Sequence, residues 1–199
     1  MYDFESGNIS LDFANTNEWH ASEHPVEHLA DYSDLVNWGV EAGLVSTEAA
    51  EDLRQFAMDH PEAAARSYDS AIQLREAIYQ VFSHHFAGTP IPESAITLLN
   101  AIASQAMAHL QLTRHEGTYQ WNFPSTLQGV DLILWSVARH ATQLLTSDQA
   151  SRVRECEDDR GCGYLFIDQT KNHSRRWCSM ESCGNRAKAK RHYSRQQAS

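Results

Sequence analysis

The chain has 199 residues and a formal net charge of −10 at pH 7. It contains no apolar run of membrane-spanning length and no signal peptide, so we expect a cytoplasmic protein with no membrane partner. The charge is unevenly spread: residues 1–150 hold five Arg and no Lys against twenty Asp and Glu, whereas residues 151–199 hold eleven basic residues against six acidic ones. This asymmetry predicts an acidic body that carries a basic module for a polyanion.

Residues 1–147 are expected to form an acidic, mainly α-helical bundle, large enough to bury its own core. Capping residues, glycine stops and apolar residues at three- and four-residue intervals predict helices over 33–43, from 46 onward, over 61–88, from 92 onward and over about 126–145. Ser33 and Ser46 are the expected N-caps of the first two helices. Alternating segments around Glu116 and Gly117 predict a small β-hairpin.

Three histidines in the body recur every four residues, at His20, His24 and His28. On a helix this spacing would place three imidazoles on one face, as in a metal site. Pro25 disfavours a helix there, because it lacks an N–H and restricts the residue before it. We therefore favour a polar loop over a second metal site.

All four cysteines lie near the C-terminus, at Cys156, Cys162, Cys178 and Cys183. Two close pairs separated by about fifteen residues suit a tetrahedral zinc, since each pair comes from one turn and the spacer can bring the second turn back. Disulfides are the alternative, because four cysteines permit three pairings. A reducing cytoplasm favours zinc, and we expect one zinc ion per chain over residues 148–199.

The segments flanking these cysteines predict a short hairpin and a basic helix. Residues 152–155 and 164–167 are expected to pair across the first two cysteines, and Ser179 is the expected N-cap of the following helix. That helix has few large apolar side chains, so a polyanion or the zinc centre must stabilise it. The expected nucleic-acid-binding residues are Arg175, Arg176, Asn185, Arg186, Lys188, Lys190, Arg191 and Arg195. For Asn185 and Arg186, ordering of the metal site is an alternative that we favour over base contact.

The C-terminal segment resembles the CGNR-type zinc finger of bacterial proteins. The resemblance rests on residues 175–180 (Arg-Arg-Trp-Cys-Ser-Met), 183–186 (Cys-Gly-Asn-Arg), 187–191 and 162–168 (Cys-Gly-Tyr-Leu-Phe-Ile-Asp). It implies four cysteine ligands for zinc and a DNA-binding finger in stress-induced transcription regulators. Five residues separate the first two cysteines, where the family more often has four, and Gly161 can absorb the extra residue in a turn.

Two shorter stretches of the body resemble the ABATE-like helical domain that accompanies this finger. They are residues 11–16 (Leu-Asp-Phe-Ala-Asn-Thr) and 32–38 (Tyr-Ser-Asp-Leu-Val-Asn-Trp). We expect this body to sense a small-molecule effector or to form a homodimer, joined to a finger that contacts DNA.

Three functional classes remain open at this point. A zinc-dependent, DNA-binding transcription regulator is the expectation, and a module that binds RNA or an acidic protein is the alternative. In a third, structural role, the basic tail docks on the acidic body. We expect no enzyme, because the sequence lacks a phosphate-binding glycine loop, a Gly-x-Ser-x-Gly elbow and a His-Glu-x-x-His motif.

Overall fold

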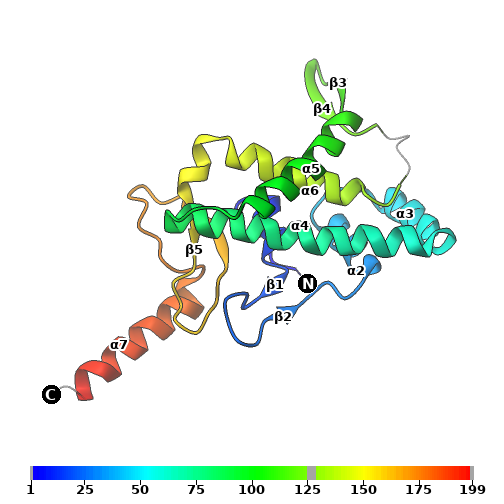
Figure 1. Cartoon of the computed structure of the whole chain (residues 1–199). Coiled ribbons are helices and arrows are strands. Elements are labelled where there is room, and N and C mark those ends of the chain that lie inside the picture. The colour runs from blue at the N-terminus through cyan, green and yellow to red at the C-terminus, as the bar shows by residue number, and fades with distance from the viewer. Residues whose placement is uncertain (1, 125–128, 198–199) are drawn as a thin grey trace.

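The computed structural model describes residues 2–124 and 129–197, without the side chains of His115, His192, Arg195 and Gln197. The helices are α1 (Ile9–Ala14), α2 (Tyr32–Glu41), α3 (Thr47–Asp59), α4 (Pro61–Ala87), α5 (Glu93–His109), α6 (Leu132–Leu145) and α7 (Asn185–Gln197). The strands are β1 (Asn17–Glu18), β2 (Val26–Glu27), β3 (Gln111–His115), β4 (Thr118–Asn122), β5 (Val153–Glu155) and β6 (Leu165–Ile167). The long helix α4 crosses the body, and α7 projects from it toward the C-terminus (Figure 1). The expected mainly helical fold with small hairpins is confirmed.

Local signals explain most helix boundaries. The Ser46 hydroxyl accepts a hydrogen bond from the Ala49 N–H and caps α3, as expected. Pro61 begins α4, and Gly88 ends that helix in the left-handed conformation at φ 66°. The cap expected at Ser33 is wrong: Asp31 caps α2 by accepting from the Asp34 N–H, so the helix begins earlier.

The start of α6 also differs from the sequence prediction. The helix begins at Leu132, and residues 129–131 form a turn. The expected start near Thr126 falls in 125–128, outside the described residues. The short helix α1 has too few residues to show a helical period, and the periodicity of the sequence did not predict it.

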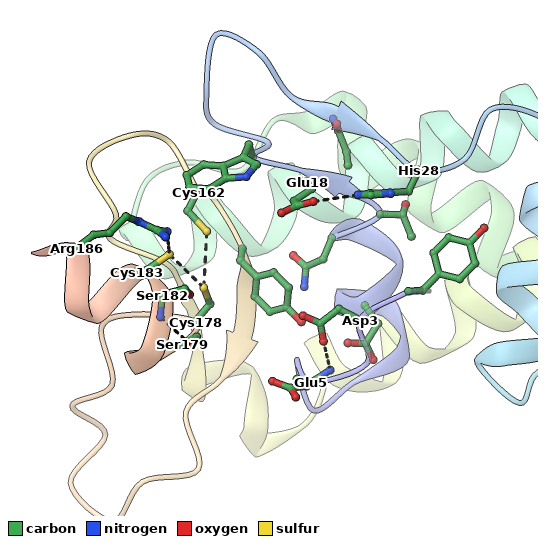
Figure 2. A pocket seen from close by; sticks show the side chains of 17 residues that line it. Asp3, Glu5, Glu18, His28, Cys162, Cys178, Ser179, Ser182, Cys183 and Arg186 are labelled. Atoms are coloured by element: carbon green, nitrogen blue, oxygen red, sulfur yellow. Dashed lines mark hydrogen bonds and ion pairs between the residues drawn. The ribbon is translucent and has the colours of Figure 1, made fainter.

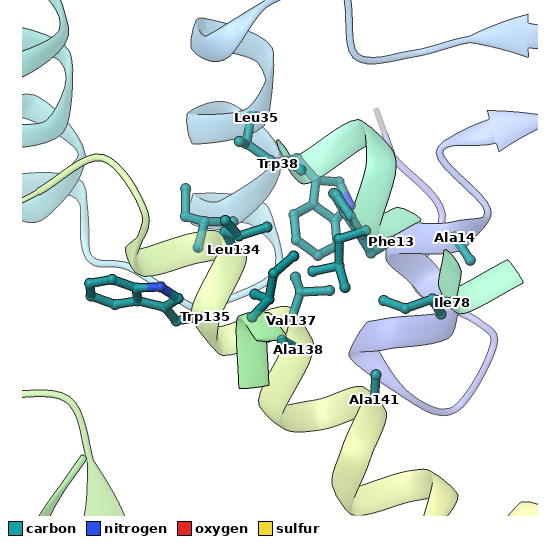
Figure 3. Packing of buried hydrophobic residues seen from close by; sticks show 14 of the residues in the cluster. Phe13, Ala14, Leu35, Trp38, Ile78, Leu134, Trp135, Val137, Ala138 and Ala141 are labelled. Carbon is teal, nitrogen blue, oxygen red and sulfur yellow. The ribbon is translucent and has the colours of Figure 1, made fainter. Parts of the chain in front are cut away.

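The core of the body lies where α1, α2, α4 and α6 meet. Trp38 of α2 is fully buried, and its ring centroid lies 4.9 Å from that of Phe13 of α1 (Figure 3). Gly39 allows α2 to approach α6 closely, because a Cβ there would lie 2.6 Å from the Ile133 Cδ1 atom. The N-terminal helix α1 is thus surrounded by helices that come later in the chain.

Each strand pair is an antiparallel two-stranded sheet. The β3–β4 hairpin turns at Glu116 and Gly117, which both have positive φ, as a two-residue hairpin turn requires. The β5–β6 hairpin follows a 3₁₀ turn at Asp148–Arg152. Its buried side chains Val153, Leu165 and Ile167 belong to the hydrophobic core of the body. No helix in residues 2–124 and 129–197 is long and apolar enough to span a membrane.

Candidate metal centre and nucleic-acid interface

The four cysteines come together at one end of the β5–β6 hairpin. Cys156 follows β5, Cys162 precedes β6, Cys178 precedes a π-helical turn at Met180–Gly184, and Cys183 lies within that turn. Ligand atoms of all four lie within 4.8 Å of one another, and no disulfide joins them. Cys178 Sγ lies 3.7 Å from Cys162 Sγ and 3.6 Å from Cys183 Sγ.

These distances fit a tetrahedral zinc. Zn–S bonds of about 2.3 Å in tetrahedral geometry place neighbouring sulfur atoms about 3.8 Å apart. Four thiolates so close together repel one another unless a cation lies between them. Hydrogen bonds from the Cys162 and Cys178 thiols lower the pKa of Cys156, while hydrogen bonds shared with Cys156 and Cys162 raise the pKa of Cys178. The cysteines therefore form a site for one zinc ion, which would hold all four as thiolates.

Two glycines shape the turn that carries Cys162. Gly161 and Gly163 have φ of 83° and 66°. A Cβ on Gly161 would lie 2.6 Å from the Ala21 carbonyl oxygen, and one on Gly163 would lie 2.8 Å from the Tyr79 hydroxyl oxygen. Only glycine therefore fits at either position, where the finger meets the body.

Arginines hold the cysteine turns together. Arg186 donates to Asp158 at 2.9 Å and to Cys183 Sγ at 2.8 Å. Burial alone would raise the pKa of Asp158, but hydrogen bonds from the Arg160 N–H and from the Arg186 and Arg160 side chains lower it to about 2. Arg175 donates to the carbonyls of Trp177 and Cys178 and lies over the Phe166 ring. Arg175 and Arg186 therefore order the metal site from two sides.

Family models agree with this geometry. One for the ABATE family, described as "Putative stress-induced transcription regulator", matches residues 7–148. A second, for the CGNR zinc finger, matches residues 152–196. The chain belongs to the ABATE family and carries a CGNR zinc finger. A search of curated proteins finds no match. The resemblance seen in the sequence is thus confirmed for both parts of this ABATE–CGNR protein.

The body of the ABATE–CGNR protein holds the finger by polar contacts. The Asn15 carboxamide exchanges two hydrogen bonds of 2.9 Å with the backbone of Leu165. Glu155 of β5 accepts hydrogen bonds from Tyr79 at 2.8 Å and Ser83 at 2.5 Å, both on α4. Sequence reasoning missed these contacts because their partners are far apart in the chain. The finger is therefore fixed to the body on its hairpin side.

Aromatic packing adds to this attachment. Trp19, in the body, lies against the cysteine cluster, and the guanidinium groups of Arg160 and Arg186 lie 5.0 and 5.3 Å from its ring centroid. His20 pairs with Glu76 at 2.7 Å and His28 with Glu18 at 3.1 Å. These two histidines thus form hydrogen bonds with carboxylates, and the cysteine group is the one metal-binding cluster found in the described residues.

The predicted nucleic-acid-binding residues divide into two groups. The Asn185 side chain donates to the Glu181 carbonyl oxygen, Arg176 pairs with Glu157, and Lys190 pairs with Asp159. Lys188 and Arg191 are exposed and form no ion pair among the described residues. Arg195 lies on α7, but its side chain is outside the described part. Asn185 and Arg186 thus make side-chain hydrogen bonds within the finger, whereas Lys188 and Arg191 are exposed.

Proposed function

We propose that this ABATE–CGNR protein is a zinc-dependent transcription regulator whose finger and basic helix contact DNA in the cytoplasm. The observation that supports this most directly is the position of α7. The helix begins directly after the cysteine turn and extends away from the acidic body (Figure 1). Zinc would fix the origin and direction of a basic surface that the described part of the chain leaves largely exposed.

The dimensions and charges of α7 suit a DNA groove. Its 13 residues span about 20 Å at the usual helical rise. The helix contains Arg186, Lys188, Lys190, Arg191 and Arg195 and no acidic residue. Its small side chains, such as Ala187 and Ala189, leave it slim enough for the major groove. Lys188 and Arg191 are the residues that we propose to contact phosphates first.

Electrostatics also argue against a tail docked on the body. The ion pairs of α7 described above are made with Asp158 and Asp159, both within the finger itself. Phosphates would compete with Asp159 for the exposed Lys190. The exposed cations of α7 attract a polyanion from outside the chain, while the acidic body repels it. A polyanion would therefore bind at the helix.

One finger per chain has a small footprint on DNA, so we propose that two copies act together. We also propose a non-enzymatic role, because four thiolate ligands leave zinc no open position for a substrate. An RNA- or protein-binding role remains the second candidate, since a basic helix by itself does not distinguish these polyanions.

A selection from genomic fragments tests the proposal. Zinc-loaded full-length protein is mixed with fragmented genomic DNA of the source organism at about physiological salt, where non-specific phosphate binding is weak. We expect a short motif to be enriched, and the double variant Lys188→Ala/Arg191→Ala to lose that enrichment. If protein with one zinc per chain retains no fragment, the DNA-binding proposal is wrong.

A further inference from the structure

A cavity of about 380 Å³ lies between the N-terminal part of the body and the zinc centre. Figure 2 shows the carboxylates of Asp3 and Glu18 on the body side, with Cys178 and Ser182 on the finger side. Ligand pockets usually measure about 300–1,000 Å³, so this cavity has room for a small organic molecule.

Negative charge dominates the walls of the cavity. Asp3, Glu5, Asp12 and Glu18 supply four carboxylates from the body. The Arg186 guanidinium in the wall already pairs with Asp158, and the His28 ring already contacts Glu18 at 3.1 Å. Among the described residues Asp3, Glu5 and Asp12 have no ion-pair partner. A zinc held by four thiolates would add a net charge of about −2 to the opposite wall.

Two buried polar groups at the cavity lack the partners that they need. Asp12 is 3% exposed, and its carboxylate accepts a hydrogen bond from the Ser6 N–H at 3.0 Å but meets no described cation. The buried Tyr164 hydroxyl lies near the Asp3 carboxylate, and its oxygen accepts no hydrogen bond in the part of the chain that the structure describes. Unpaired groups of this kind destabilise a folded protein unless something binds them.

We propose that this cavity binds a small organic cation, an amine or a guanidinium compound, with Asp12 as its counter-ion. The cation would supply the positive charge that Asp12 lacks and a donor for the Tyr164 hydroxyl oxygen. A bare metal ion fits less well, because the cavity carboxylates do not form a ligand cluster; among the described residues only the four cysteines do.

The position of the cavity gives such a ligand a route to the finger. One wall is made by the body and the other by residues next to the zinc-binding cysteines, so a bound cation contacts both parts. Binding of the cation does not depend on the proposed function. Its role as a signal for DNA binding rests on that function. The ligand would then favour one orientation of α7.

Calorimetric titration of zinc-loaded full-length protein tests the inference. The probes are n-butylamine, 1,4-diaminobutane and butylguanidine at constant ionic strength, with butan-1-ol as the uncharged control. We expect one site per chain for at least one cation and none for butan-1-ol. Asp12→Asn should weaken binding at least tenfold, and Tyr164→Phe several-fold.

Matched variants separate this site from general attraction to an acidic protein. Asp69→Asn removes an exposed carboxylate on α4, away from the cavity, and should leave the affinity unchanged. Tyr164→Phe removes a hydroxyl whose oxygen accepts no hydrogen bond from the described residues, so it should remain folded and still bind cations more weakly. Failure of all three cations to bind, or equal binding by Asp12→Asn and Asp69→Asn, would overturn the inference. DNA retention by the same protein is scored separately, so either proposal can fail alone.

Discussion

The side chain of Asn15 pairs with the backbone of Leu165 as a neighbouring strand would, although 150 residues separate them. Asn15 belongs to the stretch by which the body resembles its family, and Leu165 belongs to the corresponding stretch of the finger. The two stretches therefore meet in the folded chain. Through this contact the body fixes the hairpin that carries the first two cysteines.

Replacing Asn15 should loosen the attachment of the finger. Leu165 is fully buried, so Asn15→Ala leaves both its N–H and its carbonyl without partners. We expect a loss of about 1–3 kcal/mol in the free energy of unfolding, measured by urea denaturation. Asn17→Ala is the control, because no side-chain hydrogen bond of Asn17 is present in the described residues. Equal stabilities of the two variants would show that the Asn15 contact contributes little.

Asp12 should make stability depend on pH. Burial raises its pKa from 3.8 to about 6, with a smaller contribution from Asp3, despite the hydrogen bonds from Ser6. The folded state therefore holds a proton that the unfolded state has lost between pH 4 and 6, and stability falls as pH rises through this window. The loss amounts to about 3 kcal/mol above pH 6.

The Asp12→Asn variant isolates this effect from other carboxylates. It should be more stable than the native protein above pH 6, and the difference should vanish below about pH 4. Chemical denaturation of both proteins between pH 3.5 and 7.5 gives the difference directly. A constant difference across this range would mean that burial does not raise the pKa of Asp12.

Removal of zinc should destabilise the finger more than the body. The Cys178 and Cys183 turn is tied to the hairpin side through the cysteines and the ion pairs of Arg176 and Arg186, while the hairpin keeps its apolar contacts with the body. We expect a chelator to release one zinc per chain and to lower the melting temperature. The stabilisation by zinc should vary with the logarithm of the free zinc concentration. The Cys178→Ser variant should bind zinc much more weakly. A melting temperature that does not change with the chelator would contradict a structural zinc.

Arg186 and Lys188 should respond differently to substitution. Arg186→Ala leaves the buried Asp158 with fewer donors, so we expect weaker zinc binding and a loss of about 1–3 kcal/mol in stability. Lys188→Ala should preserve both zinc affinity and stability while weakening DNA binding. Competition with a zinc indicator dye measures the zinc affinity of the two variants, and thermal melts measure their stability. Identical behaviour of the two variants would remove the distinction between residues that order the metal site and residues that contact DNA.

The sequence predicted the features that depend on near neighbours. Helices with a local start or stop, such as those at Ser46 and Gly88, were found because capping is decided within one turn. The cysteine spacing predicted the metal cluster because each close pair of cysteines comes from one turn. The start of α2 was misplaced, because Asp31 and Ser33 both qualify as caps and only the path of the chain selects between them.

Features that depend on distant partners could not be predicted. The pairing of Asn15 with Leu165 and the cavity beside Asp12 arise only when both ends of the chain meet. The total charge of the C-terminal segment indicated a polyanion but not which cations stay accessible. That depends on the acidic residues between Cys156 and Cys162, which pair with Arg176, Arg186 and Lys190.

The salt dependence of DNA binding tests the central claim most directly. Affinity of zinc-loaded protein for a selected fragment is measured between 50 and 300 mM salt, beside Lys188→Ala/Arg191→Ala and the metal-free protein. Each lost phosphate contact reduces the slope of log K against log salt by about one, so the double variant should show a slope shallower by about two. Metal-free protein should bind far more weakly. Unchanged slopes, or equal binding without zinc, would contradict a zinc-ordered helix that contacts DNA.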